Sequence, residues 1–464
     1  MKFKALIPLL VVPFILSGCK TNTDKSGKGD EDNTEEKGVV TLRMSGMAKT
    51  STKEPYELSF KYNNSYFDHS AAVFDDDLKL LSFASACVGG YPEIAVEFFT
   101  TMFFDNHQAN GYDQEITKDT VAYYFAHKTI NDYDLIAVTI RGSDYGEEWA
   151  NNFYLGESGN HAGFTLRANE IYETLGNYVA EMTGENRTAK IWMTGYSRAG
   201  GIANVLADKL MSEENSYVTG DNLFVYTFEA PAGIATENIN AYPNVFNIIN
   251  SRDLVTRIPP VEYGLGRCGV DIDIYNTGWK NMVYKFDSGI VIPEFHSKSG
   301  SYGNELEFIN YLLASLMSEP SSEAYAAYSL ATRESYAATF QDSIGYFMGF
   351  YFTLNNAQKE ALMGAFDGLD AMSFLMAFYS ENGLFNLLSP ALAEAEVEYD
   401  ETQLKAALET VRIFLISHPD FMLMIIDTSN QSINENTIDN IKRVIFMHYP
   451  EVTYALISQQ QFTI

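Results

Sequence analysis

Ser197 lies at a junction that suits a nucleophile. The apolar run 190–194 leads directly into the sequence Gly-Tyr-Ser-Arg-Ala at 195–199, and the following stretch, 198–211, carries apolar side chains at helical spacing. A serine in a tight strand-to-helix turn is exposed above a sheet, and small residues two positions before and after it prevent collisions there. Free N–H groups at the start of the helix would face an anion beside it. The pattern predicts nucleophilic attack by Ser197.

A nucleophilic serine needs an acid and a base, here in the chain order Ser, Asp, His. Asp253 follows the apolar run 245–250, so its carboxylate is expected at the carboxyl end of a strand, on the same sheet edge as Ser197. Glu229 and Asp271 are weaker substitutes. The sequence therefore favours Asp253 as the acid.

Three histidines follow Asp253, and each could supply the base: His296, His418 and His448. His448 precedes Pro450, which can open a helix so that the loop before it presents the imidazole. We favour His448, keep His296 as the alternative and place His418 third. Choosing His448 requires the chain between acid and base to fold so that its ends return close together, which costs little because loop-closure entropy grows slowly with length.

The elements that must position these residues follow an α/β pattern. Short β-rich runs alternate with two helical stretches, 166–182 and 198–211. The strands are expected at 121–127, 135–140, 190–194, 223–228 and 245–250. Asn131-Asp132 reads as a hairpin turn between the first two. From about residue 301 the spacing becomes helical, with no run of 18 apolar residues, so this region is not a transmembrane bundle.

Composition excludes several classes of protein. The chain has 31 Lys+Arg against 61 Asp+Glu, a net charge of −30, which makes nucleic acid an improbable partner. With 46% hydrophobic residues it can bury a large core. Its three cysteines cannot form a disulfide framework, although Cys87 and Cys268 either pair or remain buried thiols. None of the seven histidines falls in a His-x-x-x-His pair, so we expect no metal and no cofactor.

The first residues resemble a bacterial lipoprotein signal peptide. Lys2 and Lys4 precede a largely apolar run, 5–16, that is too short to span a bilayer, and Leu-Ser-Gly-Cys at 16–19 resembles a lipobox. The resemblance implies that Cys19 carries a lipid after cleavage. The mature chain would then be held at the outer face of a membrane, outside the cytoplasm.

Five motifs follow one another along the chain. These are Leu-Ile-Ala-Val-Thr-Ile-Arg-Gly-Ser-Asp at 135–144, His-Ala-Gly-Phe at 161–164, the serine turn at 195–199, Phe-Glu-Ala-Pro at 228–231 and Asn-Ser-Arg-Asp-Leu-Val-Thr-Arg-Ile-Pro-Pro at 250–260. In this order they resemble the class 3 (fungal-type) lipase family. Two positions depart from the family pattern, because Ala199 and Glu229 stand where glycine is usual.

The resemblance implies an α/β-hydrolase fold with a mostly parallel sheet and a large all-helical insertion or cap. The expected organisation is a signal peptide at 1–18, a tether at 19–38, the core at 39–300, the helical region at 301–440 and a return to the core at 441–464.

The resemblance also implies an activity and an oxyanion hole. The expected enzyme is a carboxylic ester hydrolase that cleaves acyl or lipid esters through an acyl-enzyme, with the triad Ser197, Asp253 and His448. The oxyanion hole would combine the backbone N–H of Arg198 with Ser143. The alternative is a non-catalytic lipoprotein that uses the same fold to bind a ligand or a surface partner.

Overall fold

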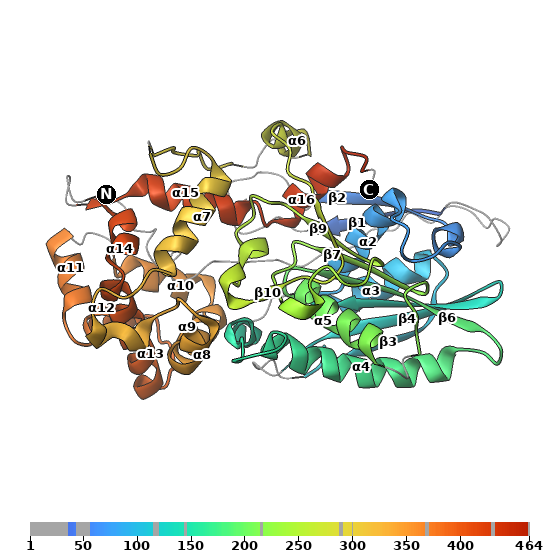
Figure 1. The fold of residues 1–464 in the computed structure, drawn as a ribbon, viewed down its shortest axis with the longest axis horizontal. Helices are drawn as coiled ribbons and strands as arrows, with labels where there is room; N and C mark the ends of the chain where they lie inside the picture. The colour runs from blue at the N-terminus through green and yellow to red at the C-terminus, as the bar shows by residue number, and fades with distance from the viewer. Residues whose placement is uncertain are drawn as a thin grey trace.

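A seven-stranded sheet forms the core of one half of the molecule, at the right in Figure 1. The computed structural model describes residues 36–42, 56–114, 120–142, 146–213, 217–286, 291–298, 300–366, 371–427 and 432–462. The strand order is β11-β9-β7-β6-β5-β4-β3, and every pair from β5 to β11 is parallel. The strands are β3 (Asp105–Asn110), β4 (Tyr123–Ile130), β5 (Tyr133–Ile140), β6 (Thr188–Tyr196), β7 (Leu223–Phe228), β9 (Val245–Ile249) and β11 (Val270–Asp273).

The five expected strands and the hairpin are confirmed. Strands β4 and β5 are antiparallel, and Ile130 pairs with Tyr133, so Asn131 and Asp132 form a two-residue turn. Asn131 has φ 40°, a conformation that asparagine tolerates better than most residues. The sequence pattern missed β3 and β11, the two edge strands, because both are short and carry mainly polar residues.

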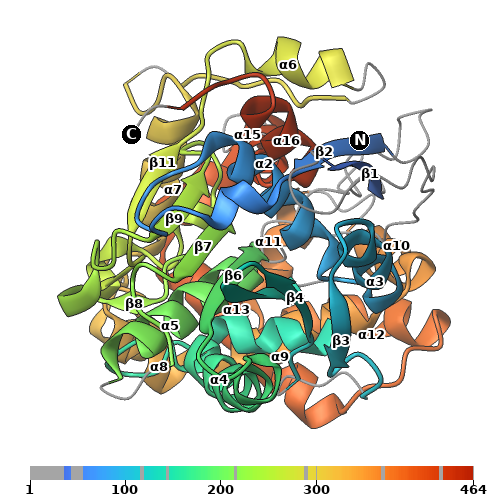
Figure 2. The same cartoon turned by 90° about the vertical axis from the view of Figure 1, so that its right-hand side faces the viewer.

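Helices cover both faces of the sheet. On one face lie α4 (Ala162–Met182) and α5 (Arg198–Ser212), and on the other lie α2 (Asp76–Val88) and α16 (Pro450–Ile457), as Figure 2 shows. Alternate residues of β6 face the two layers: Met193 packs with α4 and α5, whereas Trp192 packs with α2. Because both faces of these parallel strands are buried, polar side chains that act on a ligand are expected at the carboxyl ends of the strands.

A helical segment occupies the other end of the molecule, coloured from yellow to red in Figure 1. Its buried side chains form an apolar cluster separate from the two clusters on the faces of the sheet. One short pair of strands, β12 (Ile426–Asp427) and β13 (Ser432–Ile433), interrupts the helices. The helices are α7 (Glu305–Leu316), η7 (Glu323–Tyr328), α8 (Arg333–Thr339), α9 (Gln341–Thr353), α10 (Asn356–Gly364), α11 (Ala371–Tyr379), α12 (Gly383–Glu394), α13 (Glu401–Ser417) and α14 (Pro419–Ile425).

Helix α15 (Glu435–Phe446) brings the chain back from this segment to the core. Its residue Ile441 packs in the cluster of the helical segment, whereas Phe446 packs in the cluster of the core. Arg443, near its end, donates from Nε to Oε1 of Glu305 at 2.7 Å and from Nη1 to the carbonyl of Pro293 at 2.9 Å. These bonds fix the direction in which the chain enters the core.

The structure describes only part of the expected amino-terminal region. Strand β1 (Glu36–Leu42) pairs with β2 (Tyr56–Tyr62), so the last residues of the expected tether, 36–38, lie in a strand. Cys19, the expected signal peptide and the rest of the tether lie outside the described residues. Among the residues that are described, no helix has the length and apolar character needed to cross a membrane.

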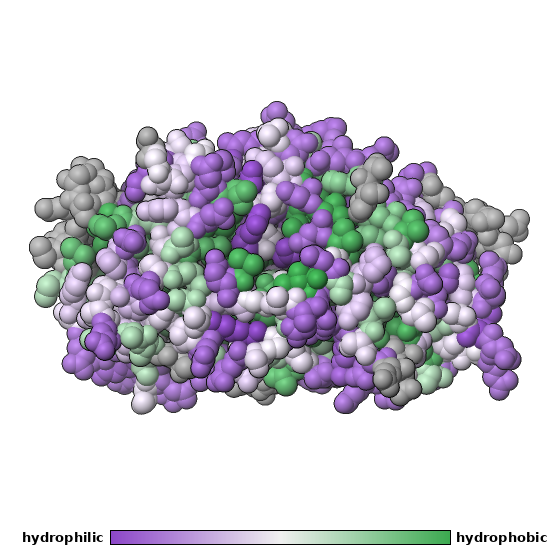
Figure 3. Space-filling view, in the orientation of Figure 1, coloured by the Kyte–Doolittle hydropathy of each residue, from purple (hydrophilic) through white to green (hydrophobic). Residues whose placement is uncertain are grey.

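The face of the molecule in Figure 3 is mostly hydrophilic, with apolar residues gathered near its middle, between the core and the helical segment.

The structure also decides whether the two remaining cysteines pair. Cys268 is fully buried, and its thiol donates to Oδ1 of Asn204 at 3.3 Å. Cys87 and Cys268 therefore do not form a disulfide with each other.

Candidate active site

The turn at Ser197 has the strained conformation expected of a serine held above a sheet. Ser197 lies between the end of β6 and the start of α5, at φ 57° and ψ −129°. A Cβ atom on Gly195 would lie 2.4 Å from the carbonyl oxygen of Ala199, and one on Gly200 would lie 2.8 Å from Cβ of Ala230. The turn thus needs glycine at 195 and at 200.

Three side chains far apart in the sequence form one hydrogen-bonded chain. Nε2 of His448 lies 2.8 Å from Oγ of Ser197, and Nδ1 of His448 lies 2.5 Å from Oδ2 of Asp253. All three residues are buried. Because the carboxylate can only accept, we assign the proton to Nδ1, so Nε2 accepts from the serine hydroxyl.

Backbone contacts hold the acid and the base in place. Asp253 follows β9, and its Oδ1 accepts from the backbone N–H of Val255 at 2.8 Å. Tyr196, next to the serine, donates from its hydroxyl to the backbone carbonyl of His448 at 2.6 Å. The imidazole is thus fixed between the end of α15 and the start of α16.

Burial sets the protonation of this chain of residues. It lowers the pKa of His448 to about 3. Burial also raises the pKa of Asp253, which the hydrogen bond from Val255 opposes. A neutral imidazole at neutral pH is the form that can accept a proton from serine.

The other candidate histidines lie away from Ser197. His296 is partly exposed, and its backbone N–H donates to Oδ1 of Asn440 at 2.7 Å. His418 is buried in the helical segment, where Nδ1 lies 2.8 Å from the carbonyl of Phe414. The structure thus brings His448, and neither of these two, into contact with the serine.

The two weaker candidates for the acid, Asp271 and Glu229, and also His161 hydrogen-bond to residues other than Ser197. Asp271 pairs with Arg267 at 2.7 Å, at the edge strand of the sheet. Glu229 is buried beside Asp253. Burial lowers the pKa of His161 to about 3, and its Nδ1 accepts from the backbone of Phe164, so this histidine caps α4.

Arg198 opens α5, so its backbone N–H belongs to the first turn of a helix, where N–H groups have no partner within the helix. Ser143, the other expected oxyanion donor, lies outside the described residues. The Arg198 side chain is buried, and its Nη1 lies 3.5 Å from Oε2 of Glu148. The other oxygen of Glu148, Oε1, accepts from Nη2 of Arg141 at 2.6 Å. This ion-pair cluster joins the end of β5, the short helix η3 (Gly146–Phe153) and the serine turn.

An apolar cavity of about 280 Å³ opens beside Ser197. Both parts of the molecule contribute walls to it, and carboxylates are absent from its described lining. The core supplies Asn152, Phe153, Leu155, His161, Phe164, Arg198, Pro231, Val255, Ile258, Pro259, Pro260 and Tyr263, and the helical segment supplies Leu313, Leu316, Met317, Leu330, Tyr336, Phe340, Ile344, Phe414 and Phe421.

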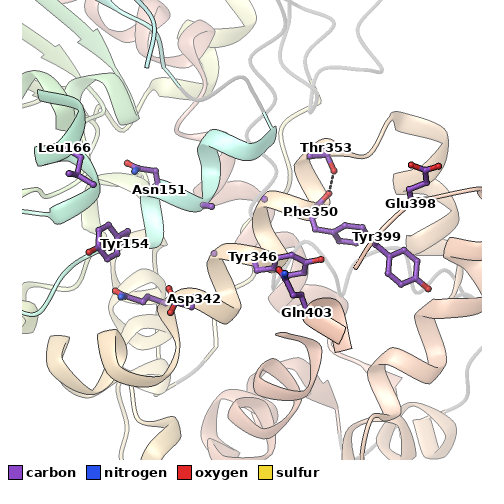
Figure 4. A pocket seen from close by; sticks show the side chains of 14 residues that line it. Asn151, Tyr154, Leu166, Asp342, Tyr346, Phe350, Thr353, Glu398, Tyr399 and Gln403 are labelled. Carbon is purple, nitrogen blue, oxygen red and sulfur yellow. Dashed lines mark hydrogen bonds between the residues drawn. The ribbon is translucent and has the colours of Figure 1, made fainter. Parts of the chain in front are cut away.

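A second, more polar cleft of about 990 Å³ lies on the other side of the contact between η3 and α9 (Figure 4). Asn151 and Tyr154 line one wall, and the opposite wall carries Tyr346, Phe350 and Tyr399. The three hydrogen-bonded residues are absent from its described lining, so we place the chemistry in the apolar cavity.

The chain is similar to known lipases. Residues 137–263 match the family Lipase (class 3). The secreted mono- and diacylglycerol lipase 1 of Fusarium solani is 28% identical over 163 residues, which make up 32% of this chain and 46% of that protein. The chain thus spans less than half the length of this relative.

Solved structures of lipases align with part of the chain. A triacylglycerol lipase described as having a serine protease triad is 18% identical, with 44% of this chain and 83% of that one covered and a TM-score of 0.35. The lipase from Rhizopus microsporus var. chinensis is 16% identical, with 42% and 72% covered and a TM-score of 0.32. With its mostly parallel sheet and serine turn the core has the α/β-hydrolase fold, and within it residues 137–263 match the class 3 lipase family.

Proposed function

We propose that this protein is a serine hydrolase that cleaves carboxylic esters of acyl lipids through an acyl-enzyme intermediate. The observation that carries the proposal is the hydrogen-bonded chain from Ser197 through His448 to Asp253, which ends at an apolar cavity. A strained serine, a neutral buried imidazole and a buried carboxylate are the parts that acyl transfer requires.

The geometry supports a two-step reaction. Oγ of Ser197 attacks the ester carbonyl while Nε2 of His448 takes its proton, and the carboxylate of Asp253 stabilises the imidazolium that forms. The oxyanion accepts a hydrogen bond from the backbone N–H of Arg198. The imidazolium then gives its proton to the leaving alcohol. In the second step His448 activates a water molecule, which hydrolyses the acyl-enzyme and frees the carboxylic acid.

The cavity indicates which part of the substrate binds there. Its walls are mostly aliphatic and aromatic, and burying each methylene of an acyl chain against such walls contributes about 0.8 kcal/mol. A charged or strongly polar group would lose its hydration without replacement. We therefore place the acyl chain in the cavity, with the ester at Ser197.

Hydrolysis of p-nitrophenyl esters of increasing chain length by the full chain tests this proposal. We expect turnover that Ser197→Ala reduces at least about 10³-fold, with the thermal transition unchanged. An exposed serine at the surface of the core, Ser212, provides the matched control, Ser212→Ala. No turnover by the wild-type protein, together with saturable binding of a lipid, would support the non-catalytic alternative instead.

We also propose that Cys19 carries a lipid that anchors the protein at a membrane, outside the cytoplasm. The supporting pattern is the basic and apolar leader ending in Leu-Ser-Gly-Cys at 16–19. Cys19→Ser should move the protein out of the membrane fraction and leave its leader uncleaved, whereas the control Cys87→Ser should fractionate like the wild type. A Cys19→Ser protein that remains in the membrane fraction after a carbonate wash would contradict the anchor.

A further inference from the structure

Glu229 is a buried acid at a position where the family pattern has glycine. Glu229 comes directly after β7, and Asp253 comes a few residues after the end of β9. These two strands are parallel neighbours in the sheet. Glu229 is fully buried and has φ 48°, a conformation that favours glycine. The chain therefore keeps a large acidic side chain at a site where a smaller residue would relieve strain, which points to a role for the carboxyl group.

The Glu229 carboxyl connects the elements that hold the acid and the base. Oε2 accepts from the backbone N–H of Asn250, at the end of β9, at 2.8 Å, and Oε1 accepts from the hydroxyl of Thr453, in α16, at 2.8 Å. The Thr453 hydroxyl also lies 3.1 Å from the hydroxyl of Tyr196, which donates to the carbonyl of His448. Glu229 also hydrogen-bonds to the side chain of Asp253.

A hydrogen bond between two carboxyl groups requires a proton on one of them. Each carboxyl group accepts two hydrogen bonds, but only Asp253 contacts the imidazole of His448, at 2.5 Å. Because the imidazole is the one donor among these that becomes positively charged in the proposed reaction, it favours the negative charge on Asp253. Burial, and then the charge of Asp253, raises the pKa of Glu229. The proton therefore belongs on Glu229.

We propose that Glu229 is a positioning residue: as a neutral carboxylic acid it donates a hydrogen bond to Asp253, and the pair carries a single negative charge behind His448. This inference deepens the proposed ester hydrolysis and rests on it. The titratable groups that face Glu229 are Asp253, His448 and Tyr196. Glu229 acts through Asp253, by fixing the carboxylate that orients the imidazole.

Two substitutions separate this role from a merely structural one. Glu229→Gln keeps the shape and an N–H donor, so it should retain kcat within about threefold. Glu229→Gly suits the backbone conformation but leaves the Asn250 N–H and the Thr453 hydroxyl without their acceptor. We expect it to lower kcat by up to about 10²-fold with KM nearly unchanged, because misplacing a catalytic group by about 1 Å costs that much.

The pH profile gives a second readout of the same role. In the wild type, alkaline pH should remove the Glu229 proton and with it the donor to Asp253, so kcat should fall. Glu229→Gln cannot lose its donor and should lack this alkaline limb. The exposed acid Glu262 provides the matched control, because Glu262→Gln should keep the wild-type profile.

Infrared spectroscopy of the full chain tests the proton without relying on activity. At pH 7 the wild type and Glu262→Gln should show a carbonyl stretch of a protonated carboxylic acid that Glu229→Gln lacks. An unchanged band in Glu229→Gln would overturn the inference, and so would wild-type kcat with a wild-type pH profile in Glu229→Gly. Absence of hydrolysis by the wild type would instead contradict the proposed function, and the infrared comparison would still decide where the proton lies.

Discussion

The α/β core and the helical segment differ in what they bury beside Ser197. The core buries polar groups with specific partners: the serine, His448, Asp253 and Glu229 form one continuous network. The helical segment buries an apolar cluster and contributes aliphatic and aromatic side chains to the cavity. The proposed reaction thus depends on residues at the ends of the strands, and the shape of the proposed acyl site depends on helices that enter between Asp253 and His448 in the sequence.

The two regions should respond differently to substitution. A buried polar group that loses its partner costs about 1–3 kcal/mol, and a misplaced catalytic group costs rate directly. An apolar wall tolerates changes that conserve volume, usually for less than about 1.5 kcal/mol. Changes in the core should therefore lower kcat, and changes in the segment should alter which chain lengths are accepted.

The largest effect is expected from the base in the core. His448→Ala should reduce ester hydrolysis by about 10⁴-fold or more, because the base and the nucleophile act as a unit. His296→Ala, the control, should keep wild-type rates, since His296 contacts Asn440 far from the serine. A large loss in His296→Ala together with activity in His448→Ala would reverse the assignment.

A smaller effect is expected from the wall that the helical segment supplies. Leu313 lines the cavity from α7, and Leu313→Trp should narrow it. The ratio of kcat/KM for long over short acyl chains should fall by at least about 10-fold, since excluding two methylenes at about 0.8 kcal/mol each already costs more than the roughly 1.4 kcal/mol of a tenfold change. Phe350→Leu, in the polar cleft on the other side of α9, should leave this ratio unchanged. An unchanged ratio in Leu313→Trp would place the acyl chain elsewhere.

The pH dependence of kcat/KM and of stability tests the buried environment of His448. His448 must be neutral to act as a base, and burial lowers its pKa to about 3. As the pH falls from 8, kcat/KM should therefore stay level through pH 6.5, the ordinary value for histidine, and decline only in more acidic solution. Because the unfolded chain binds this proton at higher pH than the folded chain, stability should decrease below about pH 6.5. Half-loss of kcat/KM at or above pH 6.5, without unfolding, would contradict this environment for His448.

The smallest effect on the reaction is expected at the contact between the two regions. Arg333, in α8, donates to backbone carbonyls of the core loop 155–160, including Gly156 at 2.7 Å and Gly159 at 2.6 Å. Arg333→Ala should lower the free energy of unfolding by about 1.5–3 kcal/mol, the value of hydrogen bonds to a charged group. Urea titration measures this change, while kcat should fall by less than about threefold. The control is Arg187→Ala, which removes an arginine that donates to Asp134 at the opposite end of the sheet, away from the contact between the two regions.

Much of the core could be predicted because its signals are local. The apolar runs predict the inner strands, and the small residues around Ser197 predict the turn, since both depend on neighbours in the sequence. The choice between His448 and His296 could not be settled in this way, because it depends on where α15 returns to the core. The edge strands β3 and β11 were missed because exposed edges need no apolar run.

The cavity could not be predicted from the sequence, for a different physical reason. Leu313, Phe340 and Phe414 read as ordinary core residues of amphipathic helices, and only the packing of separate helices leaves a space between them. Glu229 was visible as a departure from the family pattern. Its hydrogen bond to Asp253 is a contact between residues that follow different strands, so it could not be predicted.

Covalent labelling with a fluorophosphonate tests the central claim most directly, because the reagent reacts only with a serine that is activated and open to an apolar ligand. Mass spectrometry should locate one adduct, on Ser197, and its rate of formation should fall by about 10³-fold or more in His448→Ala and remain unchanged in His296→Ala. An intact chain that forms no adduct, or forms it at another serine at the wild-type rate in His448→Ala, would contradict the account.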